Sequence, residues 1–131
     1  MKYLLIAGSR TFDDRETFNR VTAEIIDGDE KFTVIVEGGA SGADTMAREY
    51  AEAHGMKYEE FKADWKQYGR AAGPKRNDEM IRFIKERNGV ALYFWDGQSK
   101  GTKQCIESAH RKGVPVTIWD TAEGRIMEEG F

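Results

Sequence analysis

Cysteine is scarce in this sequence, and the scarcity argues against both a disulfide-stabilised fold and a zinc site. The single cysteine, Cys105, has no partner for an intramolecular disulfide, which fits a reducing compartment. Cys105, His54 and His110 form no cluster at metal-ligand spacing, so we expect no bound metal and no resident cofactor. Cys105 lies within a helical pattern, where a small core role is favoured over a reactive one.

Long hydrophobic runs are also missing. The apolar run at residues 3–7 is far too short to cross a bilayer, and polar residues follow it at once. The start of the chain lacks the pattern of a secretory signal peptide. We therefore expect a cytoplasmic protein with no membrane partner.

The chain carries no excess of positive charge. Its 131 residues include 20 lysines and arginines against 23 aspartates and glutamates, which gives a net charge of -3. This balance disfavours electrostatic binding of nucleic acid, which requires a basic face. It remains compatible with a local basic pocket for one phosphorylated small molecule.

Apolar runs alternate with amphipathic stretches along a chain of one-domain length. The order predicts an α/β fold, a single Rossmann-like three-layer domain over residues 1–131 with a mostly parallel five-stranded sheet. The predicted strands lie at residues 3–7, 32–36, 58–61, 90–94 and 115–119. The predicted helices lie at residues 14–27, 42–54 and 100–112, with helical spacing also resuming at residues 80–84.

Two segments fall outside this alternation. Residues 62–75 are too long and irregular for a plain connector, and long loops in compact domains are often functional. The charged tail, residues 120–131, is predicted to be peripheral, either as a short helix or as a frayed end.

Polar and glycine-rich motifs follow four of the predicted strands. Because parallel strands present their carboxyl ends at one edge of the sheet, we expect the motifs to converge on a single ligand crevice. The motifs are Gly8-Ser9-Arg10, Gly38-Gly39-Ala40-Ser41-Gly42-Ala43-Asp44, Asp64-Trp65, and Trp95-Asp96-Gly97-Gln98-Ser99-Lys100-Gly101-Thr102.

The run after the second strand has the composition of an anion-binding loop. Its glycines permit close approach of the backbone, and the amides of the following helix point towards an anion. Ser41 is predicted to cap the helix or to donate to a phosphate, and Asp44 to accept from a ribose hydroxyl or to favour the helix dipole. A tight turn with a good cap explains the same residues. Neither a dinucleotide-binding fingerprint nor a P-loop is present.

The run after the fourth strand has a similar design, with Ser99, Gly101 and Thr102 at a helix start. Arg10 and Arg76 are candidates for charge-assisted contacts with phosphate, although a solvated surface role is the alternative for each.

Three further side chains each have two alternative roles. Asn77 is a candidate ligand contact or a cap-like hydrogen-bonding residue. Trp65 and Trp95 follow strands and are predicted either to stack on a base or to pack in the core.

The motifs in their order and spacing resemble the YspA-like branch of the SLOG superfamily, over residues 2–119. That superfamily includes the Lonely-Guy phosphoribohydrolases and the DprA proteins. The residues that carry the resemblance are Gly8-Ser9-Arg10, the run 37–44, Ala63-Asp64-Trp65, Gly69, Ala72-Gly73, Arg76-Asn77, Met80, Ser99 and Gly101-Thr102.

The resemblance implies a bacterial or phage protein with a Rossmann-like fold that binds nucleotides. Some relatives cleave the N-glycosidic bond of nucleoside monophosphates, and others sense ADP-ribose derivatives. Arg76 and Met80 match the arginine element of the Lonely-Guy enzymes. Their glutamate after Gly-Thr has no clean match, because Glu107 comes one helical turn later than expected.

These considerations favour a sensor or sequestering domain for a nucleotide or an NAD- or ADP-ribose-like molecule. The alternative is a nucleotide N-glycosidase or phosphoribohydrolase, which requires a carboxylate. Asp44, Glu37, Asp64 and Asp96 are available, and we favour Asp64 and Asp96, with Arg76 as a catalytic partner. A DprA-like DNA-associated protein is the third and least favoured reading. By analogy with related families we expect a homodimer or a higher oligomer.

Overall fold

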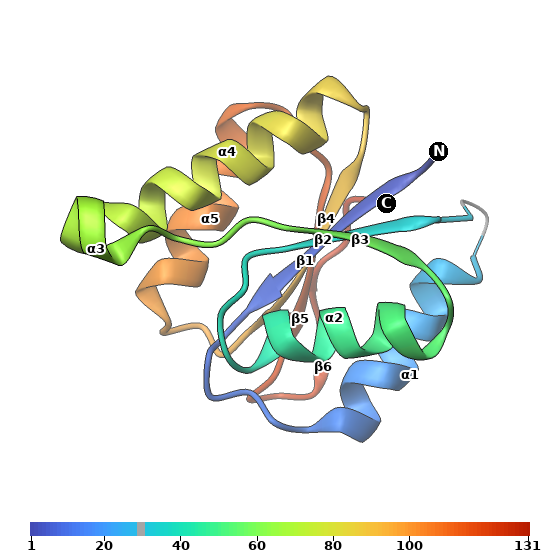
Figure 1. The fold of residues 1–131 in the computed structure, drawn as a ribbon. Helices are drawn as coiled ribbons and strands as arrows, with labels where there is room; N and C mark the ends of the chain where they lie inside the picture. Colours follow the sequence, from blue (N-terminus) through green and yellow to red (C-terminus); the bar gives the residue numbers. More distant parts are fainter. Residues whose placement is uncertain (29–30) are drawn as a thin grey trace.

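The computed structural model describes residues 1–28 and 31–131, and it places six strands in one sheet (Figure 1). The strand order is β3-β2-β1-β4-β5-β6, and every neighbouring pair is parallel except β5 and β6. The strands are β1 (Tyr3–Gly8), β2 (Val34–Glu37), β3 (Lys57–Glu60), β4 (Val90–Trp95), β5 (Val116–Asp120) and β6 (Arg125–Glu128).

Helices cover both faces of the sheet, so the three-layer α/β prediction is confirmed (Figure 1). The helices α1 and α2 lie on one face, and α4 and α5 lie on the other. The bounds are α1 (Arg15–Ile26), α2 (Ala43–Ala53), α3 (Trp65–Tyr68), the 3-10 helix η1 (Gly69–Ala71), α4 (Ala72–Glu86) and α5 (Lys100–Arg111).

Alternation along β1 distributes the core between the two faces. Leu4 and Ile6 pack beneath α1 and α2, whereas Leu5 and Ala7 pack beneath α4 and α5. All four side chains are buried. Buried on both faces, the central strands appear in the sequence as nearly continuous apolar runs.

Two predictions about the flanking segments need correction. The sheet has six strands, not five, because the charged tail folds back and adds a strand. Asp120 stabilises the turn before this strand by accepting hydrogen bonds from the amides of Ala122 and Glu123. The resulting strand β6 is antiparallel to β5 and has largely exposed side chains, which concealed it from hydrophobic patterning. Residues 62–75 are mostly helical, and α4 begins at Ala72 rather than near residue 80.

Pro74 explains why the start of α4 is hard to recognise from sequence. It occupies the first turn, where a backbone N–H has no partner within the helix and its loss costs little. Among the described helices, none has the length and apolar character needed to span a membrane.

The sheet order creates a topological switch between β1 and β4. The chain runs outward from β1 through β2 to β3, then returns to place β4 on the other side of β1. In open α/β sheets the crevice above the carboxyl ends of two such strands is the usual ligand site. Gly8 pairs with Phe94 at this point, and the Ser9 amide donates to the Phe94 carbonyl at 3.0 Å.

We predict that Gly8→Ala lowers the free energy of unfolding by about 1–3 kcal/mol, the usual cost of overpacking. A Cβ at Gly8 would overlap the Phe94 carbonyl oxygen and force β1 and β4 apart. The control is Gly101→Ala in the first turn of α5, where a Cβ meets no atom within 4 Å. Urea unfolding of both variants measures the difference, and equal stabilities would contradict the prediction.

Candidate functional site

A pocket of about 460 Å³ opens above the carboxyl ends of β1 and β4. Its walls come from the loops after these strands, the glycine-rich loop after β2 and the first turns of α4 and α5. The lining includes Gly8, Ser9, Arg10, Ala40, Asp44, Trp65, Arg76, Asn77, Asp96, Ser99, Gly101 and Thr102. Most of the residues singled out from the sequence therefore surround one pocket.

A smaller pocket of about 230 Å³ adjoins the first on the side of the glycine-rich loop. The two pockets share Arg10, Ala40, Trp65 and Arg76, so together they form one cleft with two compartments. The smaller compartment is completed by Gly38, Gly39, Ser41, Lys62 and Ala63.

The cleft is richer in positive charge than the chain as a whole. Five cationic side chains line it, and two carboxylates, those of Asp44 and Asp96, oppose them. The five are Arg10, Lys62, Arg70, Arg76 and Lys100. The chain itself has a net charge of -3, so the cations are concentrated where the strands end.

Arg76 anchors the wall between the two compartments. Its side chain is buried, and its guanidinium donates to the carbonyl of Gly38 and, at 2.8 Å, to Oδ1 of Asn77. A Cβ at Gly38 would collide with this guanidinium and with Asp44, which explains the glycine at that position. Asn77 in turn donates to Oε1 of Gln104 at 2.8 Å. A chain of hydrogen bonds therefore joins the glycine-rich loop to α4 and α5.

Asp44 is a buried carboxylate on the first turn of α2. Its Oδ2 accepts from the Ala40 amide at 3.2 Å, whereas its Oδ1 is buried without a hydrogen-bond partner. Burial raises the pKa of Asp44 to about 6, and the positive charge of Arg76 and the Ala40 amide oppose the rise. Because Asp44 lines the larger pocket and has unused acceptor capacity, it is a candidate acceptor for a ligand hydroxyl.

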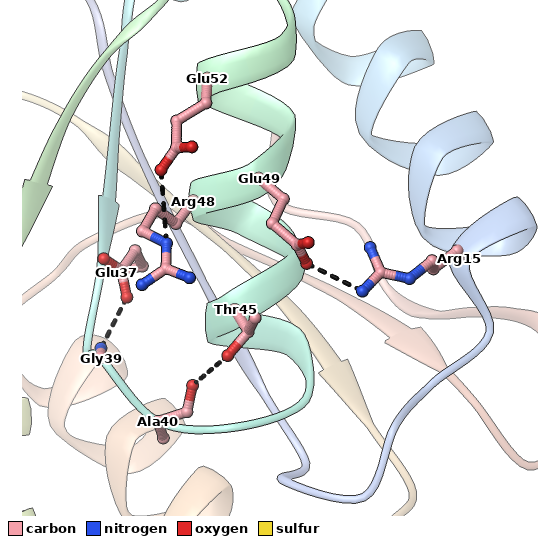
Figure 2. Close-up of polar contacts among 8 residues, drawn as sticks. All are labelled: Arg15, Glu37, Gly39, Ala40, Thr45, Arg48, Glu49 and Glu52. Atoms are coloured by element: carbon pink, nitrogen blue, oxygen red, sulfur yellow. Dashed lines mark hydrogen bonds and ion pairs between the residues drawn. The ribbon is translucent and has the colours of Figure 1, made fainter.

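Glu37, at the end of β2, is the least exposed carboxylate in the described residues, with 1% of its surface exposed. Its Oε1 accepts from the Gly39 amide at 2.6 Å (Figure 2), and its Oε2 has no hydrogen-bond partner. Burial raises the pKa of Glu37 to about 7, although the Gly39 amide lowers it, and the charges of Glu60 and Asp44 add to the rise.

The start of α5 forms the opposite wall of the larger compartment. Ser99 occupies the cap position, but its hydroxyl makes no capping bond and lies 3.4 Å from the hydroxyl of Thr102. The preceding turn is held by Asp96, whose Oδ1 accepts from the amides of Gln98 and Ser99 at 2.9 and 2.8 Å. These bonds hold the pKa of Asp96 below its usual value, so it is ionised near neutral pH.

The two tryptophans differ in their surroundings. Trp65 has 47% of its surface exposed, lines both compartments and has the guanidinium of Arg10 5.2 Å from its ring. Trp95 is partly buried, and its Nε1 donates to the Ser99 carbonyl at 3.0 Å, so it supports the loop before α5. Trp65 is therefore the tryptophan available for stacking on a ligand.

Other residues singled out from the sequence lie away from the larger pocket. Asp64 is exposed, caps α3 by accepting from the Gln67 amide at 3.1 Å, and lines neither compartment. Ser41 donates to the Arg10 carbonyl at 3.1 Å and does not cap α2. Glu107 is exposed on α5 and lines neither compartment.

The sequence alone did not assign a role to several residues that line the cleft. Arg70 and Lys62 lie in the irregular segment 62–75, and Lys100, part of the motif after the fourth predicted strand, opens α5 without having been assigned a role. The available signal was the position of Lys62 and Lys100 after predicted strands and, for Arg70, its place in the irregular segment. Cys105 also lines the larger pocket, but burial raises the pKa of its thiol to about 12, so it carries no thiolate near neutral pH.

Comparison with known proteins identifies the family of the chain. A model of the YspA, cpYpsA-related SLOG family matches residues 3–68. The chain belongs to this family. Gene 61 protein of Mycobacterium phage D29 is 38% identical to it over 123 residues, which cover 88% of this chain and 94% of the phage protein. The predicted SLOG resemblance is thereby confirmed.

A solved structure supports the fold of this SLOG chain. The X-ray structure of DNA processing protein A (DprA) from Streptococcus pneumoniae superposes with a TM-score of 0.66 at 18% sequence identity. The match covers 90% of this chain and 50% of the DprA chain, so this chain spans half the length of that protein. At this identity the likeness concerns the Rossmann-like fold alone.

The raised pKa of Glu37 makes a prediction about stability. The pKa of this carboxyl group rises from 4.5 to about 7 on folding, so its protonated form stabilises the folded protein below pH 4.5. This stabilisation is lost as the pH rises from 4.5 through about 7. Relative to Glu37→Gln, the wild type should therefore lose up to about 1.4 kcal/mol of unfolding free energy per pH unit across this interval. Urea unfolding at a series of pH values measures the difference, and parallel curves would contradict the assignment.

Proposed function

We propose that this SLOG chain binds a nucleotide or an NAD- or ADP-ribose-like molecule in the cleft above β1 and β4, as a sensor or sequestering domain. The observation that carries the proposal is the concentration of five cationic side chains at the topological switch of the sheet, in a chain that is acidic overall. Phosphorylated ligands have the complementary charge.

The walls offer a different partner for each part of such a ligand. The start of α5 supplies amides and the hydroxyls of Ser99 and Thr102, and Lys100 and Arg10 supply positive charge for phosphate groups. Asp44 keeps one carboxylate oxygen for a ribose hydroxyl. Trp65 offers an exposed aromatic surface to a base.

Cleavage of an N-glycosidic bond is less well supported than binding. Of the two carboxylates favoured from the sequence, Asp64 lines neither compartment, and Asp96 accepts two backbone hydrogen bonds that stabilise its turn. Glu107 is exposed on α5. Asp44 is the carboxylate of the larger pocket with an unpaired oxygen, and we assign it to ligand binding.

A thermal-shift series tests the proposal and separates these functions. A ligand that binds the native state raises the melting temperature by mass action. We expect a shift with NAD, ADP-ribose or a nucleoside phosphate, and recovery of the ligand intact when the mixture is analysed by mass spectrometry. Release of free base would identify an N-glycosidase instead. No shift with any of these molecules would overturn the proposed function.

We predict that Arg10→Ala weakens binding of the shifting ligand by about 10-fold, through loss of a charge-assisted contact. Arg20→Ala is a matched control, because Arg20 is also exposed and also stacks on a tryptophan, with its guanidinium 5.4 Å from the Trp119 ring. Trp119 lies outside both compartments of the cleft. Isothermal titration calorimetry gives both affinities, and equal losses would contradict the placement of the site.

A further inference from the structure

The glycine-rich loop after β2 has two of its backbone donors already occupied. The Gly39 amide donates to Oε1 of Glu37 at 2.6 Å, and the Ala40 amide donates to Oδ2 of Asp44 at 3.2 Å. An anion that enters the smaller compartment therefore meets amides that are bound to carboxylates. Because like charges repel, the ionised form of either carboxylate also opposes that anion.

Charged groups from several elements surround Glu37. Glu60 is its register partner on β3, and Asp44 and Arg48 reach it from α2. Arg48 extends between Glu37 and Glu52 (Figure 2), and its Nε lies 3.4 Å from the Glu52 carboxylate, so its charge is shared. Lys62 lies beside Gly39 at the rim of the smaller compartment. The immediate surroundings of the Glu37 carboxylate thus combine two further carboxylates with a shared arginine.

The unpaired Oε2 of Glu37 is the second feature of this arrangement. It is buried and has no hydrogen-bond partner, whereas Oε1 is bound to the loop. A buried carboxylate with half of its acceptor capacity unused is destabilised in its charged form. Neutralisation removes this penalty and leaves a weaker acceptor for the Gly39 amide.

We propose that binding of an anionic group at the glycine-rich loop is coupled to the uptake of a proton by Glu37. Glu37 is thus a positioning residue, which acts through the Gly39 amide. The inference rests on the proposed function and adds a regulation of the same cleft. The proton joins the Glu37 carboxylate, and no covalent bond of the ligand changes. The neutral side chain frees the Gly39 amide for the anion and removes a negative charge beside it.

The pKa values place this coupling near neutral pH. Burial raises the pKa of Glu37 to about 7 and that of Asp44 to about 6. An arriving anion raises both values further, since it disfavours a second negative charge. Linkage then requires that anion affinity increases as the pH falls through this range.

The test uses two probes, sulfate and NAD, whose anionic groups keep a constant charge between about pH 6 and pH 8. Affinities are measured by isothermal titration calorimetry across this range, in buffers with different ionisation enthalpies that report the protons taken up. For the wild type we expect binding about 10-fold tighter at the acidic end and uptake of a fraction of a proton.

Two variants separate the role of Glu37 from a general acidic effect. Glu37→Gln keeps an acceptor for the Gly39 amide but does not titrate, so it should lose most of the pH dependence and the proton uptake. Glu59→Gln is the control, because Glu59 is exposed on β3 and, unlike Glu60 and Asp44, is not among the main causes of the raised pKa of Glu37. It should behave as the wild type does, and circular dichroism checks that both variants are folded.

The outcomes separate this inference from the proposed function. Binding that is independent of pH in the wild type, or an unchanged pH dependence in Glu37→Gln, would overturn the proton coupling while the ligand site stands. Failure of the wild type to bind either probe at any pH would overturn the coupling, and failure in the wider ligand series would overturn the proposed function. If the affinity loses its pH dependence in Glu37→Gln but keeps it in Glu59→Gln, the coupling is established.

Discussion

The cleft depends on a line of hydrogen bonds that begins at a buried guanidinium. Arg76 donates to the Gly38 carbonyl on one side and to Asn77 on the other, and Asn77 donates to Gln104 on α5. Three segments far apart in the sequence are thus fixed relative to one another. A buried arginine is costly to desolvate, and its charge must be compensated by polar partners. The nearby Asp44 and the Gly38 carbonyl supply that compensation.

Much of the architecture could be predicted because it is local or periodic. Apolar runs that end in glycine identified β1 and β2, and the alternation of strands and helices determined the parallel sheet. The strand β6 could not be found in this way, because its side chains are largely exposed and its pairing with β5 depends on a turn at Asp120. The start of α4 was concealed by Gly73 and by Pro74, a proline that is tolerated because it occupies the first helical turn.

Sequence order also predicted that these motifs converge on one cleft, but not the contacts that each residue makes there. Asp64 and Asp96 are both acidic residues in segments that follow strands, yet Asp64 caps an exposed helix and Asp96 supports a turn inside the cleft. Trp65 and Trp95 follow the same pattern and differ as widely. Which side chains face the pocket is decided by contacts with distant segments, and one sequence carries no direct signal of these contacts.

The two helix starts that border the cleft show how similar compositions give different chemistry. Before α5, Asp96 binds the amides of the preceding turn, while the hydroxyls of Ser99 and Thr102 stay beside the first turn of the helix. Before α2, Glu37 and Asp44 occupy two amides of the glycine-rich loop itself. At α2 the carboxylates therefore compete with any anion for the loop amides, whereas at α5 the carboxylate is bound to the turn before the helix. Glycine content alone does not make a phosphate site, because the amides must also be free, and in the proposed coupling the freedom of the Gly39 amide depends on the charge of Glu37.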